Sequence, residues 1–110
     1  MTRHLYLVFS NPAPGREDGF NDWYDNTHLK DVMNVEGFEA AQRFALSNTD
    51  PAQTHQYRYL AVYEVSDVDV ARKALVETRE ERNRSMPPGI MEDDRMSLWM
   101  SAASDRVEAS

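Results

Sequence analysis

Cysteine is absent from this chain of 110 residues. Disulfides, thiolate-bound zinc sites and catalysis by a thiol are therefore excluded. Basic residues are few, since 12 Lys and Arg stand against 19 Asp and Glu and give a formal net charge of −7. Because nucleic acid and anionic lipid surfaces attract basic proteins, we expect neither nucleic acid nor a membrane as a partner.

Long apolar runs are also missing. The first apolar stretch, residues 5–9, is too short for a signal peptide or a membrane span. We therefore expect a cytoplasmic protein in a reducing compartment. The composition, 41% hydrophobic and 28% charged, is typical of globular proteins, and a chain of this length can build one hydrophobic core. One domain over residues 1–103 is predicted, with a polar tail over residues 104–110.

The apolar residues follow strand-like and helix-like spacings in the order βαββαβ. Phe20, Trp23, Tyr24 and Thr27, for example, recur at the spacing of one helix face. With short connections and right-handed crossovers, this order predicts an α+β fold, the ferredoxin-like βαββαβ plait. That fold is a four-stranded antiparallel sheet with two helices on one face. Strands are predicted at residues 4–9, 38–46, 56–65 and 96–103, helices at residues 17–34 and 68–84, and a hairpin loop at residues 47–54.

The predicted strands have two chemically different sides, because neighbouring side chains alternate. One side is aliphatic, and we expect it to lie beneath the helices; it includes Leu5, Leu7, Phe9, Leu60, Val62, Met96, Leu98 and Met100. The other side is aromatic, and we expect it to face away from the helices; it includes His4, Tyr6, Tyr57, Tyr59, Tyr63 and Trp99, and Arg43 could join them.

The aromatic side is too apolar to stay in water on a monomer. Two subunits could close sheet to sheet, the surface could bind a flat apolar ligand, or a homodimer could enclose a ligand cavity beside its interface. The alternative is that the tyrosines only pack a dimer interface, with their hydroxyls at its rim.

The densest group of reactive side chains lies in the first predicted helix. His28 follows Asp25 by three residues and precedes Asp31 by three. Histidine titrates near neutrality, and a carboxylate bonded to one ring nitrogen would leave the other free for proton transfer. The alternative is a structural histidine that caps its helix or bonds a carbonyl group. A metal site is not expected, because no second histidine lies nearby in the sequence.

Other catalytic motifs are absent from the sequence. There is no nucleophile elbow, phosphate-binding loop or dinucleotide fingerprint. The charged run over residues 77–84 is interpreted as a solvated helix face rather than as a partner site.

A longer pattern connects these features. Residues 5–9, Phe20-x-x-Trp23-Tyr24-x-x-x-His28-x-x-Asp31-Val32, Gly37-Phe38 and Arg43-Phe44 together resemble the EthD-like proteins of the dimeric α/β-barrel superfamily. This resemblance implies a homodimer formed sheet to sheet. It also implies chemistry on small cyclic or aromatic compounds, mostly without metal, and it matches the helical histidine of the family to His28. The haem-degrading branch instead relies on a histidine in the second helix, which residues 68–84 lack.

The residues and the resemblance together predict a cofactor-independent enzyme of the isomerase, cyclase or lyase kind, acting on a small apolar carbonyl compound that is aromatic, polyketide-like or a lactone. His28 would move a proton next to the carbonyl group, oriented by Asp25 or Asp31. A donor would stabilise the enolate oxygen, and aromatic rings would form the walls; the candidates are Tyr6, Tyr59 and Arg43 as donors and Trp23, Tyr63 and Trp99 as walls. Two alternatives stay open: a non-catalytic homodimer that binds a hydrophobic metabolite, and a cofactor-free monooxygenase that acts on a phenol or quinol.

Overall fold

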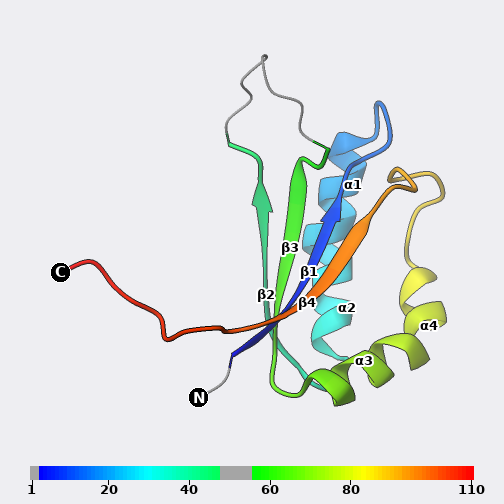
Figure 1. The fold of residues 1–110 in the computed structure, drawn as a ribbon. Coiled ribbons are helices and arrows are strands. Elements are labelled where there is room, and N and C mark those ends of the chain that lie inside the picture. The colour runs from blue at the N-terminus through cyan, green and yellow to red at the C-terminus, as the bar shows by residue number, and fades with distance from the viewer. Residues whose placement is uncertain (1–2, 48–55) are drawn as a thin grey trace.

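The structure is a computed structural model that describes residues 3–47 and 56–110 (Figure 1). It confirms the βαββαβ order. The strands are β1 (His4–Ser10), β2 (Phe38–Ala45), β3 (Tyr59–Val65) and β4 (Met96–Ser101). The helical segments are α1 (Glu17–Trp23), the π-helical turn η1 (Tyr24–His28), α2 (Leu29–Met33), α3 (Val68–Glu77) and α4 (Arg79–Asn83).

The four strands form one antiparallel sheet in the order β2-β3-β1-β4. This strand order and the helical layer are those of the ferredoxin-like α+β fold, as predicted. Tyr6 in the middle of β1 is paired with Tyr63 on β3 and with Trp99 on β4. An aromatic row therefore crosses three strands on one side of the sheet.

Several predicted boundaries change. Strand β3 begins at Tyr59 rather than at residue 56, and β4 ends at Ser101. The second predicted helix is divided at Thr78, whose hydroxyl donates to the carbonyl of Ala74 at 2.8 Å. The predicted hairpin loop lies almost wholly outside the described residues. Within residues 3–47 and 56–110, no helix combines the length and the apolar character needed to cross a membrane.

The prediction of which side of the sheet faces the helices is wrong. Tyr63 is 1% exposed and Phe20 of α1 contacts Tyr59, with ring centroids 5.3 Å apart, so the aromatic side lies under the helices. The aliphatic side is the open one, and Leu98 and Met100 are 39% and 49% exposed there. Strand alternation separates two sets of side chains, but it does not tell which set the crossovers cover.

Acidic Glu17 and Asp18 lie in the first turn of α1, where the helix dipole favours them.

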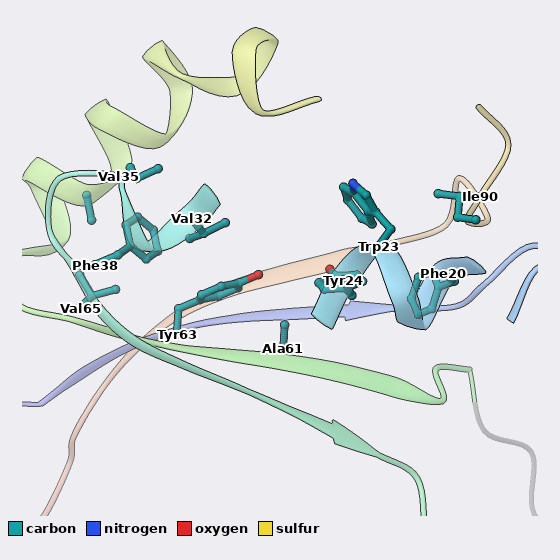
Figure 2. Packing of buried hydrophobic residues seen from close by; sticks show 11 residues of the cluster. Phe20, Trp23, Tyr24, Val32, Val35, Phe38, Ala61, Tyr63, Val65 and Ile90 are labelled. Carbon is teal, nitrogen blue, oxygen red and sulfur yellow. The ribbon is translucent and has the colours of Figure 1, made fainter. Parts of the chain in front are cut away.

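The core fills the space between the aromatic side of the sheet and the helical layer. Figure 2 shows Tyr63 pointing from β3 toward the helices, between Val32 and Tyr24. The buried cluster comprises Phe20, Trp23, Tyr24, Val32, Val35, Phe38, Ala61, Tyr63, Val65, Ala71 and Ile90.

Candidate functional site

A cavity of about 440 Å³ lies between the aromatic side of the sheet and the helical segments. We call it the His28 cavity. Its volume is within the range typical of sites for small molecules. Its apolar lining consists of Tyr6, Val8, Trp23, Tyr24, Val32, Tyr63, Leu75, Met86 and Met91. Its polar lining consists of His28, Arg79, Arg82, Asn83, Asp93, Arg95 and Ser97.

His28 enters the cavity from the π-helical turn. The backbone N–H of Leu29 bonds to the carbonyl of Tyr24, five residues earlier, instead of the four of an α-helix. The imidazole stacks on Trp23, with ring centroids 4.4 Å apart, and meets the edge of Tyr24 at 5.1 Å. Such single π-turns inside α-helices occur frequently at functional sites.

The ring of His28 lacks the carboxylate partner that the sequence predicted. Its Nδ1 atom is buried and has no hydrogen-bond partner in the described part of the chain. The carboxylate of Asp25 instead accepts from Arg43 at 2.8 Å, and that of Asp31 accepts from the Ser85 hydroxyl at 3.4 Å. The predicted hydrogen bond from His28 to Asp25 or Asp31 is therefore wrong, because other donors hold both carboxylates.

The charge state of His28 follows from its surroundings. Burial, and then the positive charges of Arg82 and Arg95, lower the pKa of His28 from 6.5 to about 4. The imidazole is therefore neutral near pH 7, and one ring nitrogen can accept a proton.

Arg43 and Tyr59 lie behind the cavity rather than in it. The guanidinium of Arg43, whose side chain is 11% exposed, bonds to Asp25 and, at 2.9 Å, to Asn21 Oδ1. It also covers the ring of Tyr24, 4.5 Å from the centroid. The Tyr59 hydroxyl accepts from Asn21 at 3.4 Å. These contacts fasten the first helix to β2 and β3, so both residues support the wall that Tyr24 presents.

Of the other predicted aromatic residues, Tyr6, Trp23 and Tyr63 line the cavity, whereas Trp99 does not. Trp99 stacks on Tyr6, with ring centroids 4.2 Å apart. Burial raises the pKa of Tyr24, and it raises the pKa of Tyr63 well above the ordinary value. Both phenols therefore remain protonated at neutral pH and can donate hydrogen bonds to a ligand.

The arginines of the cavity were not predicted from the sequence. Arg79 and Arg82 belong to the charged run interpreted as a solvated face, yet both line the cavity. A signal was present: Leu75, Arg79, Arg82 and Met86 recur at spacings of four, three and four residues, which places them on one helix face. Arg95 lies in the segment before β4, where no spacing rule relates it to the helix.

Comparison with protein-family models finds no match. One curated relative, core atranone cluster protein 1 of Stachybotrys chlorohalonatus, is 44% identical over 52 residues. The matched segment is 47% of this chain and 20% of the relative. The chain therefore spans about a fifth of the length of this curated relative.

Solved structures match nearly the whole chain. A protein from Bordetella bronchiseptica described as an antibiotic biosynthesis monooxygenase matches with a TM-score of 0.70 and 14% identity, over 98% of this chain and 100% of that one. The cofactor-independent oxygenase SnoaB from Streptomyces nogalater matches with 0.64 and 13%, over 97% and 98%. An EthD-family protein from Bacillus halodurans matches with 0.59 and 12%, over 96% and 100%.

The chain has the ferredoxin-like α+β fold of these solved structures. The resemblance to EthD-like proteins is thus confirmed as a likeness of fold. The described residues contain no group of three or more His, Asp or Glu side chains placed to hold a metal ion.

Proposed function

We propose that this chain is a cofactor-independent enzyme that removes a proton from a small aromatic or polyketide-like carbonyl compound, with His28 as the base. This proposal rests on a neutral His28 that lines an aromatic-walled cavity and whose Nδ1 has no hydrogen-bond partner among the described residues. A buried polar atom without a partner is costly in a folded protein. A ring kept free of structural hydrogen bonds so that it can transfer a proton is one explanation for such an atom.

The proposed step is a proton transfer at the carbon next to a carbonyl group. The C–H bond breaks, its proton moves to His28, and its electron pair forms the enolate. A phenol hydroxyl of Tyr6 or Tyr63 would donate to the enolate oxygen, and one such preorganised donor contributes about 3 kcal/mol. Return of the proton to a different carbon isomerises the substrate. Attack of the enolate carbon on a second carbonyl group of the same molecule closes a ring, with the proton returned to the new alkoxide, and loss of a leaving group completes an elimination.

A second candidate is a cofactor-free monooxygenase, which the similarity to SnoaB favours. His28 would again accept a proton, here from the hydroxyl group of a phenol or quinol, and the resulting anion would then reduce O₂. One oxygen atom enters the product as the carbonyl group of a quinone, and the other leaves as water with the hydrogen of the oxidised carbon and the hydrogen of the hydroxyl group. The surroundings of His28 support both candidates equally, because both reactions begin with the loss of a proton.

One assay separates the candidates. Phenols, hydroquinones and β-diketones are incubated with the protein in D₂O, while deuterium incorporation is followed by NMR and O₂ by electrode. We expect enzyme-dependent deuterium exchange or isomerisation without O₂ uptake. Uptake of one O₂ per product, with one labelled atom retained from ¹⁸O₂, would support the monooxygenase. Neither signal, together with tight binding, would indicate a non-catalytic binding protein.

The open aliphatic side of the sheet supports the predicted homodimer. The interface would then be the aliphatic side of the sheet, and not the aromatic side as predicted. Leu7 on β1 is paired with Val62 on β3 and Leu98 on β4, so apolar rows cross the sheet there. A contiguous apolar surface of this kind is uncommon on soluble monomers. We propose that a second copy of the chain covers it.

Leu98→Asp is expected to give a monomer, because a symmetric interface would bury the new carboxylate twice without a partner. Sedimentation at micromolar concentration measures the change. Val76→Asp is the matched control, since Val76 is 62% exposed on α3, away from the open side. A monomeric wild-type protein, or equal effects of the two substitutions, would contradict this interface.

A further inference from the structure

We propose that the His28 cavity takes an aromatic substrate that carries a carboxylate, and that Arg82 binds this carboxylate. The inference deepens the proposed function, on which it rests for the identity of the site. The evidence for the carboxylate is the positive charge of the arginines around the cavity.

Positive charge is concentrated at the cavity of an otherwise acidic protein. The formal net charge of the chain is −7, yet three arginines line this one cavity. They are Arg79 and Arg82 from α4 and Arg95 from the segment before β4. Asp93 is the acidic residue of the lining. Such a local excess attracts anions even when the protein as a whole repels them.

The guanidinium of Arg82 is held by neutral acceptors. Its Nη2 donates to the carbonyl of Leu75 at 2.6 Å, and its Nε donates to the Thr78 hydroxyl at 3.0 Å. Asp31, which interacts electrostatically with Arg82, is bonded to Ser85. Within residues 3–47 and 56–110, the ion pairs instead use Arg3, Arg43, Arg58 and Arg106. The charge of Arg82 is thus fixed in place without a carboxylate partner.

Position and burial distinguish Arg82 from its neighbours. Arg82 is half-buried, whereas Arg79 and Arg95 are exposed. Arg95 donates from Nη1 to the sulfur of Met91 at 3.6 Å, which leaves its charge uncompensated as well. A half-buried guanidinium gains more from a carboxylate than an exposed one, because water screens the pair less. Arg82 is therefore the principal anchor, and Arg95 assists it.

The anchor and the base would act on the same ligand. Arg82, Arg95 and His28 line the same cavity, and the positive charges of both arginines lower the pKa of His28. A bound carboxylate would offset these charges and raise the pKa of His28 again, which would strengthen it as a base. The aromatic walls, with Trp23 and Tyr63 among them, suit the ring system of the substrate.

The test uses 1-hydroxy-2-naphthoate as a probe and its carboxamide as an uncharged analogue of nearly the same shape. Affinities are measured by calorimetry for the wild-type protein, Arg82→Gln and Arg84→Gln. Arg84→Gln is the matched control, because Arg84 is exposed, follows the same helix and does not line the cavity. Both substitutions remove one positive charge.

We expect the wild-type protein to bind the acid at least tenfold more tightly than the amide. Arg82→Gln should weaken binding of the acid by about 10- to 100-fold and leave the amide unchanged, since a hydrogen bond to a charged group is lost. Arg84→Gln should behave as the wild type. If Arg82→Gln fails to fold, Arg95→Gln should show the same selective loss to a smaller extent.

Equal binding of acid and amide, binding of neither, or equal effects of Arg82→Gln and Arg84→Gln would overturn the inference. These outcomes are independent of turnover. A protein that discriminates the acid through Arg82 but shows no proton exchange would refute the proposed activity and keep the carboxylate site.

Discussion

His28→Gln is expected to slow proton exchange into the substrate by about 10²- to 10⁴-fold, the usual contribution of a positioned acid–base group. Glutamine fills a similar space and can still form hydrogen bonds, but its amide cannot accept a proton near neutral pH. Rates are measured by NMR in D₂O for wild-type protein and variant under the same conditions. The loss should be mainly in kcat, because the ring is needed for the chemical step more than for binding.

His4→Gln is the matched control for this variant. His4 lies on β1, bonds through Nδ1 to the Ser101 hydroxyl at 2.7 Å and does not line the cavity. It should exchange protons at the wild-type rate. Equal rates for wild-type protein and His28→Gln would remove His28 from the mechanism, and an equal loss in both variants would indicate a general effect on folding.

The pH dependence tests the same residue. Since burial and the two arginines lower the pKa of His28 to about 4, the acid limb of kcat/KM should lie near pH 4 rather than near 6.5. An acid limb near pH 6.5 that persists in His28→Gln would assign the base to another group.

Folding stability should change in the same pH range. Between pH 6.5 and about pH 4, the unfolded chain binds a proton at His28 that the folded chain does not. The contribution of neutral His28 to the free energy of unfolding is therefore fully present above pH 6.5. It is lost as the pH falls toward 4, by about 3 kcal/mol at most. Urea unfolding of His28→Gln should lack this part of the pH dependence.

Deleting Asn26 is expected to abolish activity to about the same extent as His28→Gln while the fold persists. The π-helical turn accommodates one residue more than an α-helical turn. Without Asn26, the hydrogen-bond ladder can run through as an α-helix, and the segments that bear Trp23 and Val32 keep their faces toward the sheet. Only the residues inside the turn change direction; Tyr24 and His28 are the two of them that line the cavity, so the deletion should displace the His28 ring.

Asn26→Ala is the control for the deletion. Asn26 is exposed, and its side chain bonds only to Asp22 among the described residues, at 2.7 Å. The substitution keeps the chain length and the π-turn, so it should keep the wild-type rate. Circular dichroism and proton exchange are measured for both variants. A deletion variant that folds and retains full activity would show that the π-turn does not position His28 for catalysis.

Much of the site follows from local patterns. The spacing of Phe20, Trp23 and Tyr24 predicted the buried face of the first helix, and all three are buried. Tyr6 and Tyr63 were predicted to share one side of the sheet, and their direct pairing confirms it. These features depend on the period of a helix or a strand, which the sequence displays directly.

Other features depend on which residues meet in space. Arg43 was predicted to contact the substrate, but Asp25 and Asn21 bind its guanidinium from the neighbouring helix. The same contact removes Asp25 from His28. A sequence shows that such residues can form hydrogen bonds, but several partners of equal chemistry compete, and the packed distances decide among them.

The sequence by itself determined the order of the elements, the two sides of each strand and the ring-rich face of the first helix, because all three follow from periodicity along the chain. Only the tertiary structure decided that the aromatic side lies beneath the helices, that a π-turn directs His28 to the cavity, and that Arg82 and Arg95 reach the same space. The cavity is formed by segments far apart in the chain, and no local spacing encodes their relative placement.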